Sequence, residues 1–279
     1  MELWLIGGIV VLLCLWMIFQ KKKFVWKTWL IFYFCMYPTK IGIKFMQKTA
    51  EKYRKILYWL GLIGIIIGYI GMIIITEEII RGVYTLFTNP QLTIGLVLPI
   101  KAKGVFYVPF IYWIISVLIV MIVHEGAHGV IAIVHKLKIK KTGIAFLGCI
   151  IPLIPAAFVE PDEKKLMKSS NLVKLSVYSA GPFANILLGF ILLPIYLYFP
   201  FGTNAVFLWL KNLIFWLSML NIGVGLFNLL PLGPIDGGRM FQTALEKIMQ
   251  QKKAVKIWKA VSYGLLIIVA GNILYALFL

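Results

Sequence analysis

The sequence predicts an all-α polytopic membrane protein with about six transmembrane helices, and three observations support this prediction. Hydrophobic residues make up 61% of the 279 residues, whereas soluble globular chains contain about 45–50%. The apolar residues are gathered into runs that approach or exceed the roughly 20 residues needed to cross a bilayer. Lysine and arginine lie in short segments beside these runs, as the positive-inside rule predicts for cytoplasmic loops.

The N-terminal membrane region, residues 1–104, is predicted to contain two spans. The first, residues 3–19, precedes its lysine run, unlike a cleaved signal peptide, so we expect a retained anchor. Residues 20–55 carry ten Lys or Arg and a single acid, and we expect one or two basic helices lying on the cytoplasmic surface. The second span is residues 56–75. Mixed charge and turn residues predict an outer loop at 76–104.

Four further apolar runs are predicted to span the membrane, at residues 105–134, 175–199, 205–230 and 258–279. The last of them follows a basic stretch expected to be a cytoplasmic helix, so residues 241–279 form a C-terminal region of one helix and one span. With this topology every basic loop lies on one side of the membrane.

The formal charge of +18 could indicate binding to nucleic acid. Because the basic residues flank apolar spans, we instead predict the lipid bilayer as their partner and no nucleic acid. The three cysteines, Cys14, Cys35 and Cys149, stand singly in apolar sequence and are expected to be buried thiols.

The third span contains a His-Glu-x-x-His motif, at residues 124–128. Residues four apart share one face of a helix, so His124 and His128 can bind one metal ion. Glu125 is about 100° around the helix from His124, close enough to act on water at that metal. Ionisable residues within a span are rare and indicate function. His128 is seven residues before the basic exit at His135, which places the site about 10 Å inside the cytoplasmic face.

A third ligand is needed, and the sequence after the fifth span offers Asp236. Prolines and a Gly-Gly pair break the helix around it, at the same predicted depth as His128. Two imidazoles and one carboxylate with an open fourth position are typical of a catalytic zinc site. We therefore predict one Zn²⁺ per chain, held by His124, His128 and Asp236, with Glu125 as general base.

Residues 142–158 are apolar but interrupted by glycine and proline. Irregular backbone at membrane depth is tolerated only where it is buried in protein or lines a cavity. We expect a re-entrant or strand-like segment here, beside the active site.

The motifs resemble those of the site-2 protease family of intramembrane zinc metalloproteases. The resemblance covers residues 105–240 and is carried by His124-Glu-Gly-Ala-His128, Asn228-Leu-Leu-Pro231, Asp236-Gly237, Gly181-Pro-Phe-Ala-Asn185 and Ala157-Phe-Val-Glu160. It implies a catalytic three-span core at 105–240 that cleaves the transmembrane segment of a substrate protein, in regulated intramembrane proteolysis. It also implies that Asn185 and Asn228 lie near the site and orient substrate or Asp236.

Two other functions stay open at this point. One is a membrane zincin that acts on another peptide substrate, whose third ligand would be a downstream Glu. The other is a metal transporter using the same residues, although no internal symmetry is visible. The Lys- and Ile-rich composition favours a multi-pass protein of a prokaryotic cell membrane. The substrate and the oligomeric state are left open.

Overall fold

The computed structural model describes residues 2–20, 23–29, 32–88, 95–148 and 154–278. The chain forms two compact units, which are described separately. The first comprises Met1–Leu57 and Glu125–Lys168, and the second comprises Tyr58–His124 and Ser169–Leu279. Helix α4 (Phe110–Val134) runs continuously from the second unit into the first.

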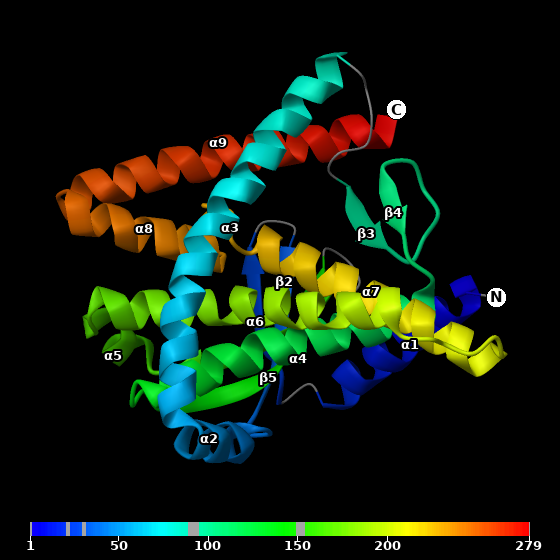
Figure 1. Cartoon of the computed structure of the whole chain (residues 1–279), viewed down its shortest axis with the longest axis horizontal. Coiled ribbons are helices and arrows are strands. Elements are labelled where there is room, and N and C mark those ends of the chain that lie inside the picture. The colour runs from blue at the N-terminus through cyan, green and yellow to red at the C-terminus, as the bar shows by residue number, and fades with distance from the viewer. Residues whose placement is uncertain (1, 21–22, 30–31, 89–94, 149–153, 279) are drawn as a thin grey trace. The chain divides into compact units, whose positions relative to one another are not determined.

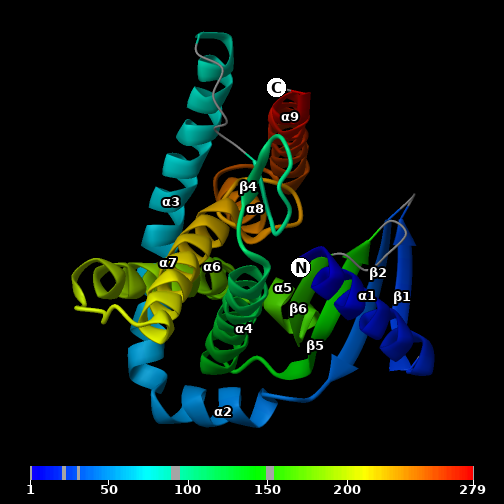
Figure 2. The same ribbon diagram turned by 90° about the vertical axis from the view of Figure 1, so that its right-hand side faces the viewer.

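The first unit is built around an antiparallel four-stranded sheet in the order β1-β2-β5-β6 (Figure 2). The strands are β1 (Val25–Trp29), β2 (Phe32–Thr39), β5 (Ile139–Gly148) and β6 (Ile154–Pro161). Its helices are α1 (Glu2–Phe19), α2 (Ile43–Lys52), α5 (Glu163–Lys168) and the C-terminal half of α4. An apolar cluster that includes Met17, Cys35 and Phe146 packs α1 against the sheet.

The strands of this unit both confirm and correct the sequence predictions. The strand-like segment expected at 142–158 is present as β5 and β6, while residues 149–153 lie outside the described residues. The prediction of basic helices within 20–55 is wrong for residues 25–29 and 32–39, which form β1 and β2. Among the described residues of this segment, α2 is a helix and α3 begins at Arg54. Aromatic and β-branched residues fill this stretch, and β5 supplies the hydrogen-bonding edge that makes them a sheet.

The second unit is helical, and Figure 1 shows α6 and α7 lying side by side and α8 turning back into α9. Its long helices are α3 (Arg54–Thr88, whose first turn belongs to the other unit), the N-terminal half of α4, α6 (Asn171–Tyr198), α7 (Ala205–Phe227), α8 (Asp236–Ile248) and α9 (Gln251–Phe278). A short parallel pair, β3 (Leu96–Leu98) and β4 (Val105–Tyr107), precedes α4. An apolar core of Ile79, Leu230, Leu232, Leu265 and Val269 joins α3, the segment after α7, and α9.

Two boundaries differ from the sequence predictions. Helix α3 continues to Thr88, well into the expected outer loop at 76–104, because no proline interrupts it before Asn89-Pro90. An exposed Arg81–Glu78 ion pair one turn apart lies on this extension. The third span begins at Phe110 instead of residue 105, because residues 105–107 pair with β3.

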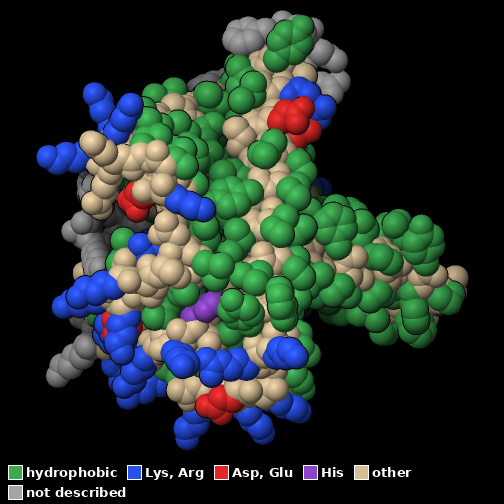
Figure 3. Space-filling view, turned by 60° about the vertical axis from the view of Figure 1, so that its left-hand side comes forward, with side chains coloured by type: hydrophobic (Ala, Val, Ile, Leu, Met, Phe, Trp, Pro, Cys, Tyr) green, Lys and Arg blue, Asp and Glu red, His purple; other side chains and the backbone are tan. Residues whose placement is uncertain are grey.

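Among the described residues, five helices are long and apolar enough to cross a membrane: α3, α4, α6, α7 and α9. Large apolar side chains on them are exposed, such as Ile66 (62%) and Ile73 (68%) on α3, as expected for contact with lipid. Figure 3 shows many hydrophobic side chains exposed on the surface. The chain is a multi-pass membrane protein. The predicted first span is a helix, α1, but it is not among these five, so the count of six is unconfirmed.

Candidate metal centre

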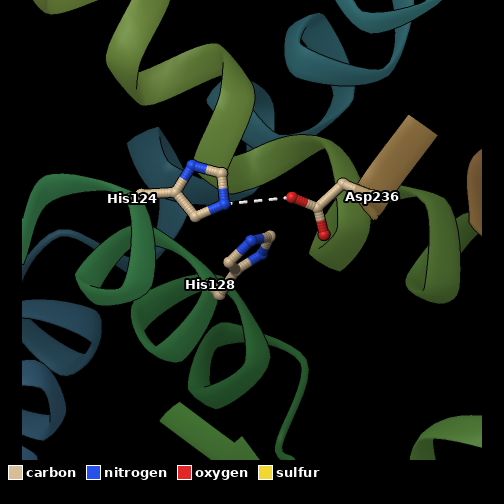
Figure 4. Close-up of side chains that lie close together, drawn as sticks. All are labelled: His124, His128 and Asp236. Atoms are coloured by element: carbon tan, nitrogen blue, oxygen red, sulfur yellow. Dashed lines mark hydrogen bonds and ion pairs between the residues drawn. The ribbon is translucent and has the colours of Figure 1, made fainter. Parts of the chain in front are cut away.

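The two motif histidines project from the middle of α4, one helical turn apart (Figure 4). No proline falls inside this 25-residue helix, so its backbone hydrogen bonds run past the motif without a break. Residues four apart face the same side. The continuity of α4 therefore holds His128 in register with His124.

Asp236 reaches His124 from the first turn of α8. Its Oδ2 lies 3.0 Å from His124 Nε2, and the side chains of His124 and Asp236 are only 12% and 16% exposed. The position at a helix N-terminus favours a carboxylate, because the end of the helix dipole there is positive. The sequence prediction that Asp236 lies close to His124 agrees with this geometry.

The turn before α8 is held by close backbone packing at Gly237. Its N–H donates to the carbonyl oxygen of Asn228 at 2.7 Å. A Cβ atom built at Gly237 would lie 2.2 Å from the carbonyl carbon and oxygen of Leu229, which is fully buried. Only glycine allows this approach, so the residue after Asp236 decides where its carboxylate sits.

The donor set fits zinc. One ligand atom from each of His124, His128 and Asp236 lies within 4.8 Å of the other two. Ligand atoms around a tetrahedral zinc, each about 2.1 Å from the metal, are separated by about 3.4 Å. Small side-chain adjustments would bring the three ligand atoms from their present separations to this distance. Two imidazoles and one carboxylate are the ligands of catalytic zinc, which keeps a fourth position open.

Glu125 is held by the backbone of β6. Its Oε2 accepts a hydrogen bond from the Val159 N–H at 2.8 Å. Strand β6 comes close to α4 at Gly129, where an added Cβ would lie 3.1 Å from the Val159 side chain and 2.3 Å from Met46 Sδ. The small residue after His128 therefore lets β6 reach the carboxylate of Glu125.

The two asparagines expected near the site make different contacts. Asn185 on α6 is fully buried, and its Nδ2 lies 3.2 Å from His124 Nδ1. The side chain of Asn228 instead donates to Val224 O within its own helix, while its backbone carbonyl accepts the Gly237 N–H. Their roles toward substrate stay predictions.

Two backbone contributions to the site are not evident from the sequence: the Val159 N–H and the packing at Gly237. The segment Ala157–Glu160 carries only a resemblance to the family. A hydrogen bond from a main-chain amide leaves no signature in residue type, so only the Asp-Gly-Gly sequence carried a usable signal.

Comparison with known proteins supports a protease site. The family model described as Peptidase family M50 matches residues 112–207 and 194–270, together more than half of the chain. The zinc metalloprotease MJ0392 of Methanocaldococcus jannaschii is 28% identical over 150 residues, which are 53% of this chain and 39% of the relative. A second protein of that organism, MJ0971, is 34% identical over 160 residues (54% and 39%). Bacillus subtilis YwhC is 28% identical over 175 residues (56% and 77%). The chain thus matches about two fifths of the length of the two archaeal relatives.

Proposed function

The chain belongs to peptidase family M50, the site-2 protease family, and from this we propose that it is a zinc metalloendopeptidase acting on a transmembrane protein substrate. It would hydrolyse a peptide bond in or near the spanning segment of that protein, as in regulated intramembrane proteolysis. One observation carries the proposal. Ligand atoms of His124, His128 and Asp236 lie within 4.8 Å of one another, and both histidines lie with Glu125 on α4, a helix apolar and long enough to span a membrane.

His124, His128 and Asp236 would hold the zinc ion. When bound, zinc supplies Lewis acidity toward a carbonyl group and toward water. The three protein donors leave a coordination position for reactants, which a structural site closed by four protein ligands would not.

Glu125 is the general base of this proposal. Its carboxylate would accept a proton from the attacking water and then pass it to the leaving amide nitrogen. The Val159 N–H at Oε2 fixes the orientation of the carboxylate. A carboxylate has about four lone-pair sites, so this hydrogen bond leaves capacity to accept the proton.

A substrate must present an extended backbone, and β6 is suited to receive it. Among the described strands β6 pairs only with β5, so it lies at an edge of the sheet. Antiparallel pairing directs alternate amides to opposite sides, and the Val159 N–H points away from β5 to Glu125. Ala157, two residues along, then points its backbone groups the same way. An extended substrate strand added there by edge pairing would run toward Glu125.

We further propose that the active site opens near the cytoplasmic face of a prokaryotic cell membrane. The basic exit after α4, including Lys136, Lys138 and Lys140, supports that side as cytoplasmic. The relatives with matching sequence come from an archaeon and a bacterium, which agrees with a prokaryotic source.

The test compares substrate cleavage by the purified wild-type protein and by a variant that lacks the proposed base. The wild type and Glu125→Gln are loaded with zinc in detergent and assayed on fluorescein-labelled casein, whose unfolded chain supplies extended backbone. They are then assayed in proteoliposomes on a single-span test protein with a Gly-Pro pair in its span. We expect Glu125→Gln to keep one zinc per chain and to lose activity by at least about 100-fold. Glu163→Gln, on α5, is the control for removing a carboxylate. Cleavage at the wild-type rate by Glu125→Gln would refute the assignment.

A further inference from the structure

Asn185 contacts His124, a proposed zinc ligand, at the ring nitrogen opposite the one that faces Asp236. Its Nδ2 lies 3.2 Å from His124 Nδ1, and the opposite ring nitrogen, Nε2, lies 3.0 Å from Asp236 Oδ2. The three side chains therefore form a row from α6 through α4 to α8. Asn185 is 0% exposed, so no bulk water competes for this contact.

The position of the proton on the His124 ring determines which hydrogen bonds this row of side chains can form. A neutral imidazole carries one N–H, and the nitrogen without it is the acceptor. If Asn185 Nδ2 donates to Nδ1, the ring proton is on Nε2 and points toward Asp236. Zinc at Nε2 needs the lone pair of that nitrogen. The proton must then be on Nδ1, and Nδ1–H needs an acceptor.

Asn185 carries that acceptor on the same side chain. Its Oδ1 is buried and has no hydrogen-bond partner among the described residues. A half-turn of the terminal amide exchanges oxygen and nitrogen, and this torsion is soft and roughly two-fold. The exchange leaves one amide atom unpaired, as before, so it costs no net hydrogen bond.

We propose that Asn185 is a positioning residue that sets the tautomer of His124. In this role its Oδ1 accepts the Nδ1–H and thereby presents the Nε2 lone pair to zinc. Metal-bound histidines commonly donate their second N–H to such a partner, and loss of the partner typically weakens metal binding 10–100-fold. The inference rests on the proposed zinc site and assigns Asn185 to the metal, not to the substrate.

The experiment measures the zinc dissociation constant of the full chain in detergent by competition with a fluorescent chelator. Asn185→Leu keeps the side-chain volume but removes the acceptor, so we expect zinc binding 10–100-fold weaker. Asn185→Asp presents a carboxylate oxygen in either orientation, so we expect binding within threefold of wild type, or tighter. Asn221→Leu is the matched control. Asn221 is equally buried on α7, its Oδ1 is also unpartnered, and its Nδ2 bonds Leu217 O in its own helix. We expect this variant to bind zinc as the wild type does.

Two results would overturn the proposal: zinc binding by Asn185→Leu within threefold of wild type, or Asn185→Asp as weak as Asn185→Leu. Nitrogen NMR of the zinc-loaded protein with ¹⁵N-histidine, of which the chain has three, adds a direct readout. We expect a protonated Nδ1 for His124 in the wild type and in Asn185→Asp, and its absence in wild type would also overturn the proposal. If the proposed zinc site itself were wrong, Asp236→Ala would bind zinc as tightly as the wild type. This result distinguishes failure of the proposed function from failure of the role proposed for Asn185.

Discussion

Replacing Gly237 by alanine should weaken zinc binding without touching any ligand. A Cβ at this position would lie 2.2 Å from Leu229 C and O and 2.4 Å from Leu230 O, where ordinary contacts begin at 3.4 Å. The methyl group therefore lacks about 1.2 Å of room. Both leucines are fully buried, and a Cβ on Gly71 of α3 would already lie 2.5 Å from Leu229 Cδ1. Because Leu229 cannot retreat, the start of α8 must move instead.

Such a movement is large for a metal ligand. Zinc sites hold their ligand distances to about 0.2 Å, and Asp236 is the residue next to the substitution. A shift of about 1 Å in its carboxylate, comparable to misplacements that cost catalysis 100-fold, should weaken zinc binding about 100-fold. Overpacking of this kind typically costs about 1–3 kcal/mol of stability, so the variant should fold with a lowered unfolding temperature.

The assay is chelator competition for zinc, run beside thermal unfolding in the same detergent. Gly233→Ala is the control, because it lies in the same connecting segment and a Cβ there meets nothing within 4 Å. We expect it to bind zinc as the wild type does. If Gly237→Ala bound zinc within threefold of wild type, the reasoning that backbone packing places Asp236 would be wrong.

Three other predictions address the metal, the base and pH. Removing zinc with a chelator should lower the unfolding temperature of the wild type, because a ligand at 1,000 times its Kd stabilises by about 4 kcal/mol; Asp236→Ala should lose that response, and an equal response in both would contradict the ligand assignment. Val159→Pro removes the N–H that orients Glu125 and should lower casein hydrolysis about tenfold with zinc content unchanged, whereas Val159→Ala, which keeps the N–H, should stay near wild type. Burial, and then the charge of Arg54, lower the pKa of His135 from its ordinary 6.5. The unfolded chain therefore binds more protons just below pH 6.5, and stability should fall as the pH drops through that region. His135→Gln should flatten this part of the curve of unfolding temperature against pH, and an unchanged curve would count against a lowered pKa for this half-buried histidine.

The long helices could be predicted from sequence because one physical requirement dominates them. A span must satisfy its own backbone hydrogen bonds and present apolar side chains, and α4, α6, α7 and α9 show this in long apolar runs with few charges. The predicted ends of the helices are less accurate. Nothing in Glu77-Glu78 stops a helix, so α3 runs on to Thr88. Charge indicates where a span leaves the membrane, not where the helix ends.

The strands β1 and β2 were missed because a strand depends on its partner. These strands are rich in aromatic residues and lie within a basic segment, a composition that also suits an interfacial helix. Whether these residues form a helix or strands depends on β5, which lies about a hundred residues later in the chain. Strand β5 pairs with β2 from Tyr33↔Gly148 to Thr39↔Thr142. Pairing over that sequence distance has no local periodicity that a pattern could reveal.

The proposed metal ligands and the groups that place them also differ in how far the sequence reveals them. His124, His128 and Asp236 could be singled out because only a few side-chain types bind zinc, and such residues are rare in spans. Two of the groups that support the site are main-chain groups: the Val159 N–H, which bonds the proposed base Glu125, and the carbonyl of Asn228, which accepts from the Gly237 N–H. A main-chain group is present at every position, so residue type does not reveal it. It follows that truncating a side chain to alanine tests the proposed ligands but leaves these two main-chain supports in place. Proline at position 159 and alanine at position 237 are the changes that reach them.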